Sequence, residues 1–230
     1  MKTIHFEEIS STNSYAKEKL GTDEFRHGTL ITATRQTEGR GRRGNSFYSE
    51  GGIYMSLMLD ARYPDYPFTL AAAVAVREAL ISLSGIVTQI KWVNDLFYKQ
   101  KKVCGILTET KIGNNNVPMG FVLGIGINTG GTKIPEELSG IAGVLHLNKD
   151  NTVVSEFIAN KIMFMYENNI NPVSEYKKGL ILNVPVKAYS NGNFLFEGIA
   201  TDINEQGNLM VKTYDGEIKL LNSGEISIKF

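Results

Sequence analysis

The sequence FVLGIGIN, residues 121–128, predicts a strand with two unlike faces. Side chains alternate along a strand, so one face would carry Phe121, Leu123, Ile125 and Ile127, and the other Val122, Gly124, Gly126 and Asn128. Glycine weakens a strand, and two glycines on one face indicate that something lies close against the backbone there. A helix packed tightly on the sheet and a bound ligand explain this bare face equally well.

Strands and helices mix on both sides of this stretch, and the pattern changes near residue 183. Short apolar runs predict strands over Thr29–Gln36, Ile53–Leu59, Gln89–Val93, Leu96–Tyr98 and Val103–Thr108. Longer runs predict helices over Ser14–Leu20, Pro67–Ser84, Val153–Asn169 and Val173–Gly179. From Val184 onward, short strands separated by turn signals predict a small all-β barrel of about five strands. We therefore expect a first domain over residues 1–182 and a second over residues 183–230.

The composition excludes several classes of protein. The 24 basic and 24 acidic residues cancel, so a nucleic acid or a membrane surface would have to be bound by a local patch. Cys104 is the only cysteine and the three histidines are scattered, which excludes an internal disulfide and a Cys/His zinc cluster. The N-terminus lacks the apolar core of a secretory signal, so we expect a protein of the reducing cytoplasm with no membrane partner.

A basic loop lies between two of the predicted strands. The run Gly39–Gly44 reads GRGRRG and offers three guanidinium groups on a backbone with three glycines. Arginine forks match phosphate oxygens, and bare glycine amides add further donors. The loop is consistent with a phosphate-binding flap, and equally with a solvated basic loop or an RNA-binding segment.

A predicted hairpin follows the first long helix. Lys91–Asp95 reads KWVND, and Lys102–Ile106 reads KVCGI, so the hairpin carries a lysine near each end and an Asn-Asp pair at its bend. A lysine in a strand is most often an exposed edge charge, and an Asn-Asp pair is most often a plain turn. Gly105 follows Lys102 by three residues and, having no side chain, leaves room for another group near that lysine.

Together these segments resemble the biotin protein ligase family. The resemblance is carried, in the order and spacing of that family, by Ser11–Asn13, Gln36–Gly44, Lys91–Asp95, Lys102–Leu107 and Gly124–Asn128. It extends over the whole chain and implies an α+β fold, with a mixed, largely antiparallel sheet of the class II synthetase type, followed by a small β-barrel. No winged helix precedes the motifs, so no DNA-binding role is expected. Val93, Asn45 and Phe47 depart from the family's usual proline, arginine and tryptophan.

The resemblance also implies a reaction. Members bind biotin and MgATP, form biotinyl-5'-AMP with release of pyrophosphate, and pass biotin to a lysine of a biotin carboxyl carrier protein. The implied catalytic residues are Lys102, Arg40 and Asp95. Biotin would be bound by Ser11, Thr12, Asn13, Gln36, Gly39, Arg40, Gly41, Arg42, Lys102 and Gly105. ATP would be bound by Arg40, Arg42, Asn45, Asn94, Lys102 and Asn128, and no metal site is expected on protein side chains.

Two other functions compete with this interpretation. Lipoate or octanoate ligases share the fold and the carrier chemistry, but their arginine-rich signature with a run of glycines is missing here. An RNA-binding module would use the basic loop and the C-terminal barrel, and it predicts a steep salt dependence that a net-neutral chain is poorly built to show. The sequence leaves open whether the protein is a monomer or a homodimer, and whether Asp95 removes a proton from the acceptor lysine or only positions it.

Overall fold

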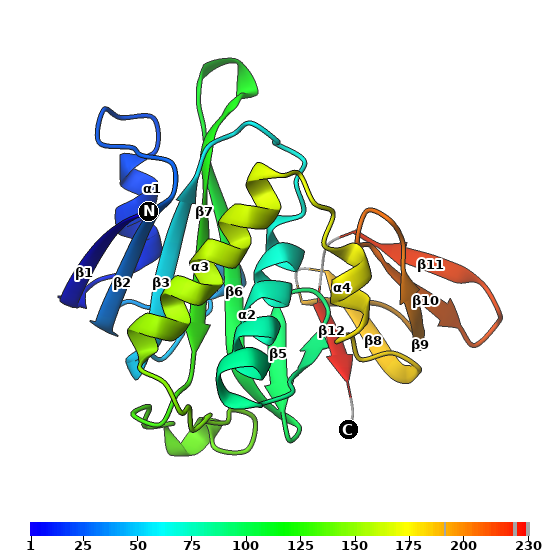
Figure 1. Cartoon of the computed structure of the whole chain (residues 1–230). Coiled ribbons are helices and arrows are strands. Elements are labelled where there is room, and N and C mark those ends of the chain that lie inside the picture. Colours follow the sequence, from blue (N-terminus) through cyan, green and yellow to red (C-terminus); the bar gives the residue numbers. More distant parts are fainter. Residues whose placement is uncertain (191, 223–224, 229–230) are drawn as a thin grey trace.

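A computed structural model of the chain describes residues 1–190, 192–222 and 225–228. Within these residues, a seven-stranded sheet has the order β1-β2-β3-β7-β6-β5-β4 (Figure 1). Its strands are β1 (Lys2–Ile9), β2 (Thr29–Gln36), β3 (Glu50–Leu59), β4 (Gln89–Lys91), β5 (Asp95–Tyr98), β6 (Lys101–Ile112) and β7 (Pro118–Ile127). The pair β1–β2 is parallel and the described pairs of the other strands are antiparallel. The predicted α+β class is confirmed.

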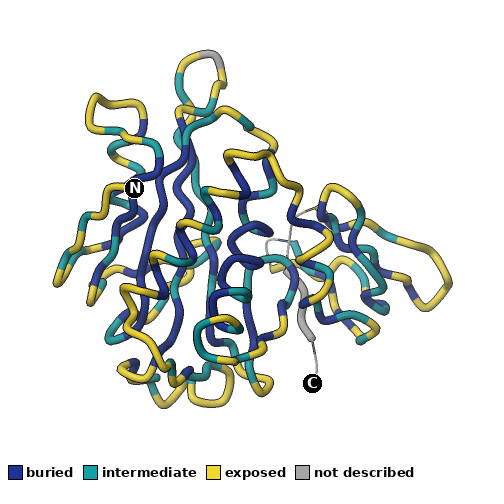
Figure 2. The backbone as a smooth tube through the Cα atoms, viewed as in Figure 1, coloured by how far each residue is buried: buried dark blue, intermediate teal, exposed yellow. Residues whose placement is uncertain are grey.

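Helices cover both faces of this sheet. The helices are α1 (Thr12–Lys19), α2 (Phe68–Ser84), α3 (Asn151–Glu167) and α4 (Val173–Lys177), with short 3-10 turns η1 (Arg42–Gly44), η2 (Asn114–Asn116) and η3 (Glu136–Leu138). The long helices α2 and α3 pack against each other over one face, and α1 packs on β3 and β7 from the other (Figure 1). The central strands are consequently buried, whereas the connecting loops at both ends of the sheet are exposed (Figure 2).

The central strand β7 divides its side chains as the alternation predicts. Its odd-numbered apolar residues join the large core beneath α2 and α3. Val122 joins a smaller core with Ala16 and Leu20 of α1. The glycine-bare face of β7 is therefore the face that carries α1, and the site described below lies on that side.

The second sheet begins at Val184. Its strands are β8 (Val184–Ser190), β9 (Asn193–Ile203), β10 (Leu209–Thr213), β11 (Ile218–Leu221) and β12 (Glu225–Ile228), in the antiparallel order β11-β10-β9-β8-β12. These are the five short strands expected of the C-terminal part. The indole Nε1 of Trp92 donates a hydrogen bond of 3.0 Å to the carbonyl of Gly207, which connects the β4–β5 hairpin to this sheet. The domain boundary at residues 182–183 stays a prediction.

Several element ends differ by a few residues from the sequence-based expectations, and β1 and β6 differ most. β1 was not expected, because an edge strand with one neighbour exposes most of its side chains and shows no apolar run. β6 was expected to end at Thr108 but continues to Ile112, where a polar run still pairs with β7. None of the helices in the described part of the chain is long and apolar enough to cross a membrane.

Candidate functional site

The bare face of β7 forms the floor of a cavity. An ideal Cβ on Gly124 would lie 2.1 Å from Oδ1 of Asn13, and one on Gly126 would lie 2.5 Å from Cε1 of Phe47. Gly124 thus makes room for the start of α1, as expected if the bare face of the strand serves to pack a helix. Gly126 makes room for an aromatic ring from the loop after β2. A cavity of about 60 Å³ remains between the floor, α1 and this loop.

The start of α1 forms a polar wall of the cavity. Ser11 caps the helix by accepting a hydrogen bond of 3.3 Å from the amide of Ser14, and Thr12 and Asn13 are buried behind it. Gln36 at the end of β2 accepts a bond of 2.8 Å from the amide of Thr12. This wall presents neutral hydrogen-bonding groups.

Ser56 holds the polar wall from below. It lies on β3 directly opposite Gly124, so its side chain points to the same face of the sheet. Its hydroxyl lies 2.6 Å from Oδ1 of Asn13 and 2.8 Å from Oγ1 of Thr12. Sequence reasoning missed Ser56, although a serine in an otherwise apolar strand is a usable signal.

The loop over the cavity is ordered by its own backbone. We call residues 39–49 the flap. The amide of Gly41 donates to the carbonyl of Asn45 at 2.6 Å, and the amide of Phe47 donates to the carbonyl of Gly39 at 2.8 Å. Gly39 is required by this close approach, since a Cβ there would lie 2.3 Å from the Phe47 carbonyl oxygen. The basic run is therefore a structured turn that places Arg40 and Arg42 at the cavity.

Two flap arginines contact the strands beneath. Nη2 of Arg40 lies 2.5 Å from Oε2 of Glu109 on β6. Nη1 of Arg42 donates to Oδ1 of Asn94 at 3.0 Å, and Asn94 donates in turn to the carbonyl of Ile106 at 3.0 Å. The Asn-Asp bend of the hairpin is thus the docking point of the flap as well as a turn.

Glu109 was missed by sequence reasoning because the expected strand ended one residue earlier. Its register opposite Val122 directs it to the same face as Gly105 and the β7 glycines. Burial alone would raise the pKa of Glu109, but hydrogen bonds from Asn13, Arg40 and Lys17 outweigh it and lower the pKa below its ordinary value. The carboxylate is therefore ionised at neutral pH.

Lys102 lies where this cavity meets a second one. Its Nζ is 2.7 Å from Oδ1 of Asp95, across the β5–β6 hairpin, and its side chain lines both cavities. The second cavity is larger, about 680 Å³, and is also lined by Lys91, Lys99, Lys101, Asp95 and Asn128. Four lysines thus line the second cavity, together with the carboxylate of Asp95.

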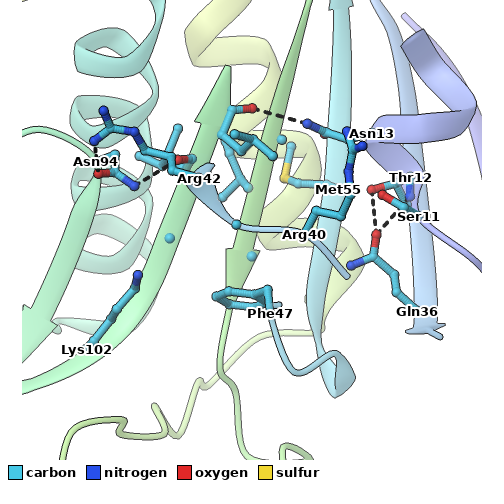
Figure 3. Close-up of a pocket in the computed structure, with 17 residues that line it drawn as sticks. Ser11, Thr12, Asn13, Gln36, Arg40, Arg42, Phe47, Met55, Asn94 and Lys102 are labelled. Atoms are coloured by element: carbon cyan, nitrogen blue, oxygen red, sulfur yellow. Dashed lines mark hydrogen bonds between the residues drawn. The ribbon is translucent and has the colours of Figure 1, made fainter. Parts of the chain in front are cut away.

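The structure brings most of the predicted site residues together (Figure 3). The first cavity is lined by Ser11, Thr12, Asn13, Gln36, Arg40, Gly41, Arg42, Asn94, Lys102 and Gly105. Asp95 and Asn128 line the second cavity instead. Gly39 supports the flap from within, and Asn45 ends the η1 turn without lining either cavity. Phe47 and Met55 also line the first cavity and were not among the predicted site residues.

Comparison with known proteins agrees with this geometry. Residues 5–128 match the model of the biotin/lipoate A/B protein ligase family, and residues 181–229 match the biotin protein ligase C-terminal domain. The chain belongs to the biotin/lipoate A/B protein ligase family. The bifunctional ligase/repressor BirA of Bacillus spizizenii is 33% identical over 98% of this chain and 73% of the relative. The biotin–[acetyl-CoA-carboxylase] ligase of Mycobacterium tuberculosis is 27% identical over 95% of this chain and 86% of its own.

Solved structures of this family have the same fold. The biotin protein ligase from Aquifex aeolicus in complex with biotin and ATP superposes with a TM-score of 0.81, at 28% identity, over 99% of this chain and 98% of that one. The resemblance to the biotin protein ligases, stated above from the motifs, is confirmed. These relatives also favour the biotin ligases over the lipoate ligases of the same family.

Proposed function

We propose that this protein is an ATP-dependent biotin–protein ligase, an enzyme that forms biotinyl-5'-AMP and passes biotin to a lysine of a carrier protein. One observation carries the proposal. A neutral hydrogen-bonding wall at Thr12 and Asn13 lies across a floor of glycines from Lys102, and Arg40 reaches over from the flap to complete a cationic wall (Figure 3). A ligand with a neutral polar head and an anionic end fits this division.

The neutral wall suits the ureido head of biotin. Amide and hydroxyl groups of Ser11, Thr12, Asn13 and Gln36 supply both donors and acceptors, and a ureido group needs both. The buried Ser56 fixes two of these side chains from behind. Because the wall is assembled before any ligand arrives, less conformational entropy is lost on binding.

The cationic wall suits the first chemical step. A carboxylate oxygen of biotin forms a bond to the α-phosphorus of ATP. The bond from that phosphorus to the oxygen bridging the α- and β-phosphates breaks, and pyrophosphate leaves with that oxygen. Two anions must approach each other, and fixed positive charge offsets both their repulsion and the charge that develops at phosphorus. Lys102 lines both cavities and would contact the carboxylate and the phosphate, while Arg40 and Arg42 approach from the flap. Magnesium enters with the nucleotide as MgATP, and Asn94 and Asn128 would contact the nucleotide.

The second cavity suits the nucleotide. It is wide, it adjoins the first cavity at Lys102, and its lysines would attract the triphosphate. Phe47 lines both cavities, so its ring would lie between the two substrates. Since the ring also fills the space above Gly126, the flap must open to admit biotin and close again over the adenylate.

The acceptor lysine needs its own route to the adenylate. A groove of about 560 Å³ between the two sheets shares Arg42, Ile106 and Leu107 with the first cavity, and Gly207 forms part of its far wall. A carrier domain seated there would direct its lysine towards the site. The carboxylate of Asp95, paired with Lys102, would then accept the acceptor's proton or position its amine.

Mass spectrometry tests the overall reaction. The protein is incubated with biotin, MgATP and a biotin carboxyl carrier domain, and the carrier should gain the mass of one biotinyl group. Lipoate in place of biotin is the control and should give no product. A carrier that gains lipoyl and not biotinyl mass would assign the protein to the lipoate ligases of the family.

Pyrophosphate exchange tests the first step alone. Lys102→Ala should reduce biotin-dependent exchange of pyrophosphate into ATP by at least about 100-fold, the usual effect of removing one electrostatic group from a phosphoryl or acyl transfer site. Lys161→Ala is the matched control, because Lys161 pairs with Glu78 on the helical layer. Near-normal exchange in Lys102→Ala would remove this lysine from the mechanism.

A further inference from the structure

We propose that Tyr176 is a positioning residue, which holds the loop of the β4–β5 hairpin so that Asn94 and Asp95 face the two cavities. We call this loop, residues 92–94, the hairpin loop. The proposal rests on the proposed function only for the reaction that the loop would serve. The holding contact is a property of the ligand-free protein and can be measured without any substrate.

The hairpin loop lies outside the strand ladder. The last pair of that ladder joins Lys91 to Asp95, so the peptide groups between them need partners elsewhere in the fold. The carbonyl of Val93, in the middle of the loop, accepts a hydrogen bond of 3.0 Å from the hydroxyl of Tyr176 on α4. Tyr176 therefore holds the loop at its centre.

The two neighbours of Val93 are held by other elements. The indole of Trp92 donates to the carbonyl of Gly207 in the second sheet. The amide of Ile106 on β6 donates to the carbonyl of Asn94 at 2.9 Å. Three elements thus hold three successive residues, and loss of the contact from α4 would leave the middle carbonyl free to turn.

Tyr176 acts from behind the site and not within it. It is fully buried, it lines neither of the two cavities nor the groove between the sheets, and its helix packs between α2 and β9 (Figure 1). A buried hydroxyl costs free energy unless it has a partner, so phenylalanine would serve better if packing were the only requirement. Burial and the nearby charge of Asp95 raise the pKa of Tyr176 well above its ordinary value, so the hydroxyl stays a donor.

The hairpin loop positions groups of both cavities. Asn94 lines the first cavity. Asp95, which follows the loop directly, lines the second cavity and pairs with Lys102 at 2.7 Å. The neutral wall belongs to the start of α1 and the end of β2 instead. Tyr176 should therefore affect the chemical step, through Asn94 and Lys102, more than the binding of the ureido head.

A matched pair of substitutions tests the proposal. Tyr176→Phe removes only the hydroxyl that holds Val93. Tyr166→Phe is the control, because Tyr166 is also fully buried, lines neither cavity and donates to Asp60 at 2.8 Å. Its hydroxyl also accepts from the amide of Tyr63 at 3.2 Å, so the control should lose at least as much stability in urea. Any effect of stability alone would therefore be as large in the control.

The first readout needs no substrate. Trp92 is the only tryptophan of the chain, so its indole N–H gives a single signal in a proton–nitrogen NMR spectrum. Tyr176→Phe should speed hydrogen exchange of this indole about fivefold and shift the carboxamide signals of Asn94, because the residue between them has lost its partner. Tyr166→Phe should leave both unchanged. Unmoved signals in Tyr176→Phe, or equal changes in the two variants, would overturn the proposal.

A second readout uses the reaction. In biotin-dependent pyrophosphate exchange, Tyr176→Phe should lower kcat about tenfold and keep the KM for biotin within about threefold, since misplaced reacting groups cost rate more than binding. Tyr166→Phe should exchange at the wild-type rate. Equal losses in the two variants, or a raised KM with unchanged kcat, would overturn the role in positioning. If wild type shows no exchange, the proposed function fails, and the NMR result still decides whether Tyr176 holds the hairpin loop.

Discussion

The two glycines of the cavity floor allow a paired test, since Gly124→Ala and Gly126→Ala add the same methyl group to one face of one strand. At Gly124 the methyl carbon would lie 2.1 Å from Oδ1 and 2.7 Å from Cγ of Asn13. Asn13 is 5% exposed and cannot move aside into solvent. Gly124→Ala must therefore displace a buried polar side chain from its partners.

The magnitude follows from the bonds that Asn13 would lose. It accepts from Ser56 at 2.6 Å and donates to Glu109 at 3.0 Å and to the carbonyl of Leu107 at 3.3 Å. At about 1 kcal/mol net for each bond, the loss of all three costs about 3 kcal/mol. Replacing glycine with alanine returns about 0.5–1 kcal/mol through the unfolded chain. The free energy of unfolding should fall by about 2–2.5 kcal/mol, a decrease in melting temperature of about 4–10 °C for a chain of this size.

Gly126→Ala is the control for this prediction. Its methyl carbon would lie 2.5 Å from Phe47, but that ring belongs to the flap and can swing outward. The free energy of unfolding should then stay within about 0.5 kcal/mol of wild type, since no buried hydrogen bond is broken. Urea unfolding of both variants, followed by tryptophan fluorescence, makes the comparison. Equal destabilisation by the two substitutions would refute the reasoning, because it would mean that Phe47 is as fixed as Asn13.

Three further predictions concern charge and the contact between the two sheets. Arg40→Gly should still form biotinyl-adenylate but release it and label proteins promiscuously; loss of adenylation without any release, measured by chromatography of the free adenylate, would contradict the flap's role. Because the fold lowers the pKa of Glu109, its ionised carboxylate adds to the free energy of unfolding above its ordinary pKa of 4.5. The difference in free energy of unfolding between wild type and Glu109→Gln, measured by urea titration, should therefore shrink as the pH falls below about 4.5. A difference that grew on acidification would contradict this sign. Trp92→Phe should lower the free energy of unfolding by about 1 kcal/mol through loss of the bond to Gly207, and calorimetry showing no change would mean that the bond contributes nothing.

Features that depend only on residue type and on spacing along the chain could be identified from the sequence. The alternation in Phe121–Asn128 correctly divided β7 into an apolar face and a bare one, because side chains in any strand alternate regardless of what surrounds it. The family motifs likewise identified Thr12, Gln36, Arg40 and Lys102, all of which line the cavity. Their roles in binding and catalysis remain predictions.

Other features depended on how distant segments meet. Ser56 lies beneath Asn13 because β3 and β7 pair in one register, and a shift of one residue would turn it into the opposite core. Glu109 reaches Arg40, which is 69 residues away in sequence, because β6 continues past the apolar run that made it recognisable as a strand. The side chains able to do the chemistry could be named from the unfolded chain, since that depends on residue type and short spacing. Which of them are paired before a ligand arrives follows only from the fold, because strand register and the packing of α1 and the flap on the sheet set the partners.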